Sequence, residues 1–141
     1  GAFLSGLALA HSGLGAVHGL AGPIGGRFQA PHGAVCAALL GPVWRANVET
    51  LSRTAPRHSA LDRYRQAAVW LTGSPRASID DGLRWITESV HGWQIPRLSQ
   101  HGLRDSDFPE LIRAAQASSS MKGNPIRLTD EVLTQVLAEA V

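Results

Sequence analysis

The distribution of charge along the chain constrains its fold more than any other feature of the sequence. Arg27 is the only charged residue among positions 1–44, and the remaining positions carry 12 of the 13 basic residues and all 11 acidic ones. Charged side chains are almost never fully buried without a partner, so a segment without them is suited to a place away from water. The first third of the chain is therefore expected to form protein core, an interface or a membrane segment.

A membrane helix is one interpretation of this segment. Residues 2–26 contain no Asp, Glu, Lys or Arg and are long enough to cross a bilayer. The same window, however, includes two histidines, Pro23 and several glycines, and its apolar pattern fades after Val17. It also lacks the charged start and the small-residue cleavage site of a signal peptide. We therefore expect no membrane segment and a cytoplasmic location.

The formal net charge of +2 and the isoelectric point near 9.3 raise the question of a nucleic-acid partner. The arginines are spread along the chain, and clusters such as Arg63 and Arg65 are followed by apolar residues. Nucleic-acid-binding domains instead gather basic residues on one face or along one helix. Solvated helix faces explain the arginines more simply, so we expect no nucleic-acid partner.

The single cysteine, Cys36, lies within the apolar run Val-Cys-Ala-Ala-Leu-Leu. One cysteine excludes a disulfide within the chain. Free cysteines are among the most buried residue types and behave as small apolar side chains. Cys36 is therefore expected to be a small residue of the core.

Apolar residues recur at helical spacing, and no segment shows the two-residue alternation of a half-buried strand. The segment Thr72-Gly-Ser-Pro75 predicts a helix end, and Ser78 with Asp81 predicts a capping box at the next helix start. A chain of 141 residues has room for one domain. We expect a single all-α domain over residues 1–141, with about five to seven helices. The expected helices cover residues 2–20, 31–51, 58–72, 78–91, 107–118 and a last segment from 129 onward.

Two histidines flank a glycine-rich stretch between the first two expected helices. His18 lies near the end of the first helix, and the chain is expected to reverse through Gly22–Gly26. Pro31 then opens the second helix with His32 in its first turn. Because neutral imidazole is a common metal ligand, two imidazoles at facing helix ends are one arrangement that can form a metal site. The alternative is a pair of structural core histidines, and two nitrogen donors alone do not make a tight site.

The stretch from His18 to Pro31-His32-Gly33 resembles the metal-binding signature of the iron-containing (group III) alcohol dehydrogenases, and the similarity extends to Leu128-Thr129. The resemblance implies an all-helical C-terminal domain of the dehydroquinate synthase-like superfamily. It also implies that four side chains hold a divalent metal, Fe(II) or Zn(II), and that His18 and His32 are two of them. The other two ligands, an aspartate and a histidine, would precede residue 1, as would the domain that binds NAD or NADP.

The resemblance further implies the oxidoreduction of small alcohols or aldehydes. The ion would polarise the substrate oxygen, and NAD or NADP would carry the hydride. The partner of this chain would be the N-terminal nucleotide-binding domain, which is absent from it, and a homo-oligomer is a further option. With half of the metal ligands and no cofactor domain, the isolated chain is expected to be inactive.

One position departs from the resembling family. Many of its members carry another histidine four residues after the first ligand, near the nicotinamide and the substrate, whereas this chain has Gly22. A proton relay through that imidazole is therefore absent. A different substrate, or proton delivery by water, is expected.

Residues 118–125 are similar to the family's late loop, which returns toward the catalytic cleft. The resemblance makes Met121 and Lys122 candidate substrate contacts. The alternative is a simple helix end, in which the charge of Lys122 interacts favourably with the C-terminal end of the helix dipole and Gly123 supplies a residue with left-handed dihedral angles.

A function from another class fits the same residues. A non-enzymatic, all-helical interaction module would use the charge-poor first third as a docking surface and keep the histidines as structural residues. The metal content of the full-length protein separates this alternative from the enzyme.

Overall fold

The structure is a computed structural model that describes residues 6, 11 and 13–141. Its described residues form six α-helices and short 3-10 turns without a β-strand, so the all-α prediction is confirmed. Residues 2–5, 7–10 and 12 of the helix expected over residues 2–20 lie outside the described part of the chain, and residues 13–15 are not helical, so that helix is not continuous. The elements are α2 (Ala16–Phe28), α3 (His32–Thr54), α4 (Ala60–Thr72), α5 (Ile79–Gly92), η1 (Leu98–His101), η2 (Asp105–Asp107), α6 (Phe108–Ala117), η3 (Ser119–Gly123) and α7 (Asp130–Ala140).

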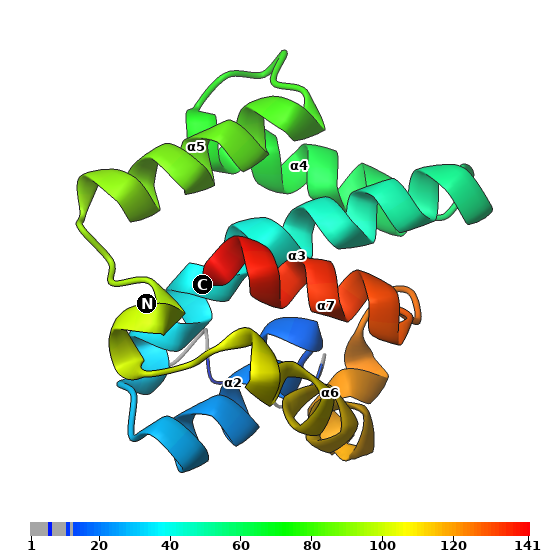
Figure 1. The fold of residues 1–141 in the computed structure, drawn as a ribbon. Helices are drawn as coiled ribbons and strands as arrows, with labels where there is room; N and C mark the ends of the chain where they lie inside the picture. The colour runs from blue at the N-terminus through cyan, green and yellow to red at the C-terminus, as the bar shows by residue number, and fades with distance from the viewer. Residues whose placement is uncertain (1–5, 7–10, 12) are drawn as a thin grey trace.

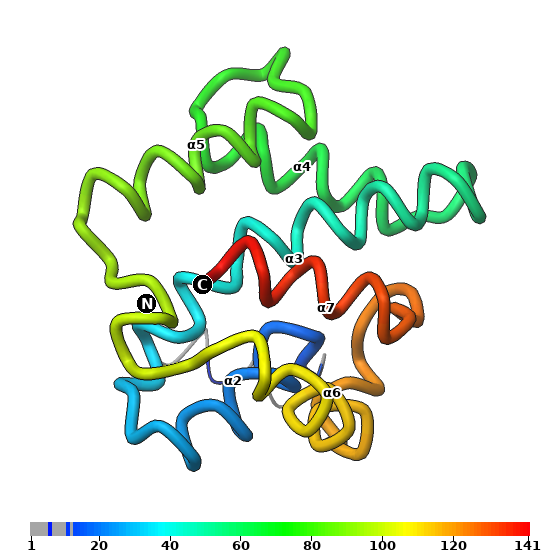
Figure 2. Tube along the Cα trace, viewed as in Figure 1, coloured from blue at the N-terminus to red at the C-terminus, as the bar shows by residue number. Residues whose placement is uncertain are grey.

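The 23-residue helix α3 is the central element. In Figure 1, α4 and α5 lie on one side of it, and α2, α6 and α7 lie on the other. The Cα trace in Figure 2 follows the same division, with α3 running between the two groups. Contacts of α3 with α2, α4, α5 and α7 agree with this arrangement. Helix α3 therefore joins two separate layers of packing.

The larger core lies between α3 and the group formed by α2, α6 and α7. Much of it comes from the charge-poor first third, which confirms the core interpretation for the described part of that segment. Among the described residues, no helix combines the length and the apolar character needed to cross a bilayer. The largest fully buried side chains of this core are Leu20, Ile24, Leu39, Leu98, Leu103, Leu133 and Leu137.

A smaller core lies between α3, α4 and α5, around Trp44, Ala68 and Ile86. Gly82 of α5 sits so close to α4 that a Cβ atom there would lie 2.6 Å from the Cβ of Ala68. The ring of Trp44 meets that of Tyr64 edge-on, with centroids 4.7 Å apart. Close helix approach and this aromatic pair hold the α4–α5 hairpin against α3.

The glycine-rich stretch does not form the expected turn. Helix α2 continues through Gly22–Gly26 to Phe28, and the chain reverses only after Gln29, which has left-handed dihedral angles of φ 50° and ψ 28°. Each glycine costs about 1 kcal/mol of helix propensity relative to alanine. Burial of Leu20 and Ile24 at helical spacing outweighs this cost. The predicted reversal through Gly22–Gly26 is therefore wrong, and His18 lies at the start of a helix rather than at its end.

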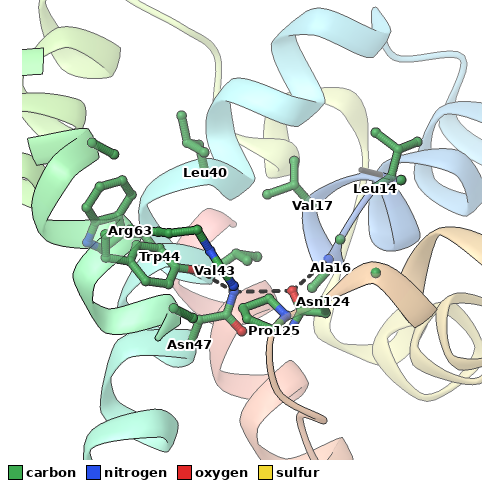
Figure 3. A pocket seen from close by; sticks show the side chains of 16 residues that line it. Leu14, Ala16, Val17, Leu40, Val43, Trp44, Asn47, Arg63, Asn124 and Pro125 are labelled. Carbon is green, nitrogen blue, oxygen red and sulfur yellow. Dashed lines mark hydrogen bonds between the residues drawn. The ribbon is translucent and has the colours of Figure 1, made fainter. Parts of the chain in front are cut away.

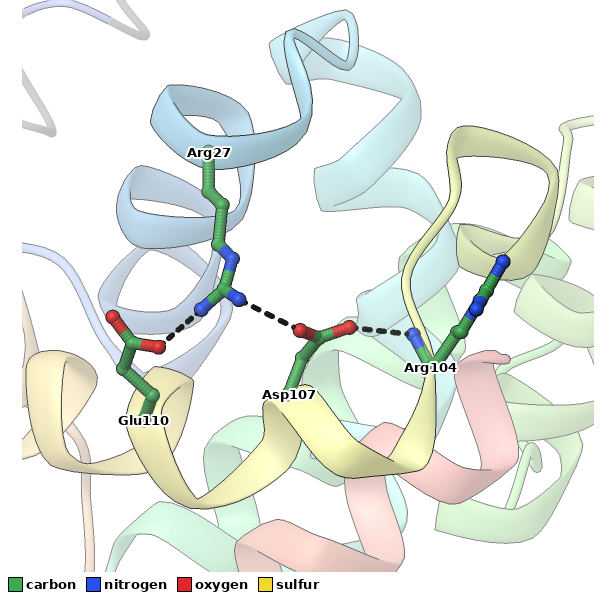
Figure 4. Close-up of polar contacts among 4 residues, drawn as sticks. All are labelled: Arg27, Arg104, Asp107 and Glu110. Atoms are coloured by element: carbon green, nitrogen blue, oxygen red, sulfur yellow. Dashed lines mark hydrogen bonds and ion pairs between the residues drawn. The ribbon is translucent and has the colours of Figure 1, made fainter.

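The one charged residue of the first third is held by an ion-pair cluster, shown in Figure 4. Arg27, near the end of α2, pairs with Asp107 at 2.8 Å and also with Glu110 in the first turn of α6. The other carboxylate oxygen of Asp107 accepts the backbone N–H of Arg104 at 2.9 Å. Exposed ion pairs contribute about 0–1 kcal/mol each, so this cluster fixes the position of α2 against α6 more than it stabilises the fold.

Candidate metal centre

Each of the two histidines lies in the first turn of its helix. His18 is the third residue of α2, and His32 is the first residue of α3, directly after Pro31. The two rings lie side by side, with centroids 5.4 Å apart and planes inclined by 50°. The structure thus brings together the two residues that the sequence singled out as metal ligands.

Cys36 is a third member of this cluster. It lies four residues after His32 on α3, and its Sγ atom is 3.4 Å from the Nε2 atom of that ring. One candidate ligand atom from each of His18, His32 and Cys36 lies within 4.8 Å of the others. Cys36 packs against the larger core, as expected, but it is only half-buried and also contacts the ring of His32. The i, i+4 spacing from His32 was the signal that could have found it.

Local electrostatics favour the neutral form of His18. Burial lowers its pKa below the ordinary value, and the neighbouring His32 ring lowers it further. Burial also raises the pKa of the Cys36 thiol. The His18 ring is therefore neutral near pH 7 and has a nitrogen lone pair free to bind a cation.

Asn124 fixes the start of the helix that carries His18. The N-cap residue of α2 is a glycine without a side-chain cap, and the Oδ1 atom of Asn124 accepts the N–H of Ala16 at 3.0 Å instead. The Nδ2 atom of Asn124 donates to the Oδ1 atom of Asn47 at 2.7 Å and to the carbonyl of Ile126 at 2.7 Å. A residue 108 positions away therefore caps α2, two residues before His18.

Asn47 is the buried partner in this network. Its side chain is 2% exposed, and its Nδ2 atom donates to the hydroxyl of Tyr64 at 2.9 Å. Figure 3 shows Asn47 and Asn124 meeting at a pocket beside the first turn of α2. The pocket has a volume of about 690 Å³. The two amides link α2, α3 and α4, so the position of His18 depends on contacts from three parts of the chain.

The two candidate substrate residues lie in η3, which packs against α2. Met121 is half-buried against Gly19, where an added Cβ atom would lie 3.0 Å from the Met121 Cε atom. Lys122 is exposed. The segment of residues 118–125 thus contacts Gly19, the residue after His18. Contact of Met121 or Lys122 with a substrate stays a prediction.

Gly123 is required for a reason other than the expected one. It does not have the left-handed backbone of a helix C-cap, because the glycines with positive φ in the described chain are Gly13, Gly73 and Gly102. A Cβ atom at Gly123 would instead lie 2.0 Å from the carbonyl oxygen of Leu14. The close approach of two backbone segments excludes a side chain here.

The whole chain matches a known family. The sequence profile of the Fe-containing alcohol dehydrogenase family, C-terminal, covers residues 1–141. The chain belongs to this family. Its relatives in the family include lactaldehyde reductase of Escherichia coli K12, which is 29% identical over 142 residues covering 96% of this chain and 35% of the relative. Alcohol dehydrogenase 4 of Schizosaccharomyces pombe is 30% identical over 140 residues, covering 99% of this chain and 31% of the relative.

Solved structures of similar proteins have the same fold. An alcohol dehydrogenase from Oenococcus oeni superposes with a TM-score of 0.81 at 23% identity, over 98% of this chain and 35% of the other. A 1,3-propanediol oxidoreductase superposes with a TM-score of 0.73 at 23% identity, over 91% of this chain and 33% of the other. The chain therefore spans about a third of the length of the family members that it matches.

Proposed function

We propose that this chain is the helical metal-binding part of an NAD(P)-dependent alcohol dehydrogenase that acts on small alcohols or aldehydes. The observation that carries the proposal is the pair of rings of His18 and His32, 5.4 Å apart at the starts of two adjoining helices. Family membership supports it, and relatives named lactaldehyde reductase and 1,3-propanediol dehydrogenase favour a small substrate. We propose that a nucleotide-binding domain before residue 1 completes the enzyme.

The donor set of this site fits a borderline divalent ion. Imidazole nitrogens suit Fe(II) and Zn(II), and a neighbouring sulfur favours these ions over Mg(II) or Ca(II), which prefer oxygen ligands. His18 and His32 would hold the ion, and the missing ligands would come from the preceding domain. When bound, such an ion acts as a Lewis acid toward the oxygen of an alcohol or aldehyde, and the nicotinamide cofactor exchanges the hydride.

The residues of this chain orient the site. Asn124 holds the first turn of α2, and burial keeps the His18 ring neutral by lowering its pKa. Gly22 is exposed one turn after His18, and a Cβ atom there would meet no atom within 4 Å. This position supplies no proton acceptor, so we propose that water takes up the proton of the alcohol.

Packing argues against the interaction-module alternative. That alternative needs the charge-poor first third as an open docking surface. In the described part of this segment, Leu20, Ile24 and Leu39 are fully buried against helices of the same chain. The segment has its apolar partners within the domain.

Activity of the full-length protein tests the proposal. Reduction of a small aldehyde with NADH or NADPH is expected to stop after removal of the metal with a chelator and to return on addition of Fe(II) or Zn(II). The 141-residue chain alone is expected to show no NAD(P)-linked turnover. Full activity of the chelated protein, or turnover by the isolated chain, would refute the proposal.

A further inference from the structure

We propose that Cys36 is a third metal-binding residue of this chain and supplies a thiolate to the ion held by His18 and His32. The inference rests on the metal site of the proposed function and deepens it. It follows from the convergence of three side chains whose candidate ligand atoms lie within 4.8 Å of one another. The resemblance to the family places two of these residues at the metal and gives no role to the cysteine.

The distance between the sulfur and the nearest nitrogen fits one shared ion. A Zn–S bond of about 2.3 Å and a Zn–N bond of about 2.0–2.1 Å that meet at about 90–110° place sulfur and nitrogen about 3.1–3.6 Å apart. The Sγ atom of Cys36 and the Nε2 atom of His32 are 3.4 Å apart. The two atoms are therefore as far apart as two neighbouring ligands of one ion.

The helix geometry fixes how the side chains of His18, His32 and Cys36 lie relative to one another. His32 and Cys36 are one turn apart on α3, so their side chains lie on the same face of one rigid helix. His18 approaches from the first turn of α2, which Asn124 fixes through the N–H of Ala16. Two adjoining helices thus place three candidate donors within 4.8 Å of one another, close enough for small side-chain movements to bring them onto one ion.

The thiol would release its proton to solvent as the sulfur bonds to the ion, with no change in oxidation state. The shell would then hold one soft anionic ligand beside the imidazoles. Soft thiolate ligands suit Zn(II), whereas imidazole ligands serve Fe(II) and Zn(II) alike. Cys36 is therefore expected to shift the preference of the site from Fe(II) toward Zn(II).

The competing explanation is an S–H···N hydrogen bond between Cys36 and His32, without a bond to metal. Replacing the metal with Co(II) separates the two, because a thiolate bonded to Co(II) gives an intense near-ultraviolet charge-transfer band. The full-length protein loaded with one equivalent of Co(II) is expected to show this band. Cys36→Ser and Cys36→Ala are each expected to lose the band and to keep the weaker visible bands of bound Co(II). Two replacements of different polarity, with circular dichroism of each, separate loss of the ligand from loss of the fold.

A competition experiment gives a second readout. The ratio of Zn(II) affinity to Fe(II) affinity is expected to fall by about tenfold or more in Cys36→Ala. Tenfold is the lower end of the losses in metal affinity that follow when a group that orients a ligand is removed. Co(II) bound to the unaltered protein without the charge-transfer band would overturn the role of Cys36 and leave the metal site intact. Failure of the unaltered protein to bind Co(II) or Zn(II) would overturn both this inference and the proposed function.

Discussion

Replacing His18 or His32 by alanine in the full-length protein is expected to weaken metal binding by more than about 100-fold. Loss of a group that only orients a ligand already costs about 10–100-fold in metal affinity, and these variants remove the ligand itself. The two rings lie side by side at the starts of α2 and α3, so neither can replace the other from its own position. Competition with a chromogenic chelator measures the affinity of each variant.

The matched control for this prediction is His91→Ala. His91 is an exposed histidine in the last turn of α5 and is not part of the cluster of His18, His32 and Cys36. This variant is expected to bind metal as tightly as the unaltered protein. Stoichiometric metal retained by both His18→Ala and His32→Ala would show that the pair does not hold the ion.

Replacing Asn124 by alanine is expected to lower the free energy of unfolding by about 2–4 kcal/mol. The change removes the cap of α2, worth about 1 kcal/mol. It also leaves the buried Oδ1 atom of Asn47 without its donor, while the Nδ2 atom of Asn47 keeps the hydroxyl of Tyr64. An unsatisfied buried polar group costs about 1–3 kcal/mol. Urea unfolding followed by circular dichroism measures the difference, and weaker metal binding should accompany it because the first turn of α2 carries His18.

A double-mutant cycle shows whether the loss comes from the paired amides. Asn124 and Asn47 exchange hydrogen bonds at 2.7 and 3.2 Å, so removing both side chains also removes the unsatisfied partner. The free energy of unfolding of the combined Asn47→Ala and Asn124→Ala variant is expected to fall by less than the sum of the two single losses. The difference is expected to be at least about 1 kcal/mol. Additive losses, or a loss below about 0.5 kcal/mol for Asn124→Ala, would contradict the role of this network.

The sequence predicted well those features that depend on neighbouring residues. Gly73 ends α4 with left-handed dihedral angles, and Ser78 forms a reciprocal capping box with Asp81, as expected. The pairing of His18 with His32 was also predicted, although for a different path of the chain. Short-range hydrogen bonds and turn preferences are encoded within a few residues, which is why the predictions at Gly73 and at Ser78 with Asp81 held.

Features that depend on tertiary contacts could not be predicted. Gly22–Gly26 favours a turn by local propensity, yet burial of the opposite face of α2 keeps the segment helical. The cap of α2 comes from Asn124, far along the chain, and Gly123 is needed because Leu14 approaches it. Cys36 combines a local and a tertiary feature. Its spacing from His32 is visible in the sequence, but its closeness to His18 depends on how α2 packs on α3.

The metal content of the full-length protein tests the central claim most directly. Elemental analysis of the purified protein, after gel filtration to remove loosely bound ions, is expected to find about one Fe(II) or Zn(II) ion per chain. The absence of any transition metal, together with failure to take up Fe(II) or Zn(II) on addition, would contradict the assignment of His18 and His32 as metal ligands.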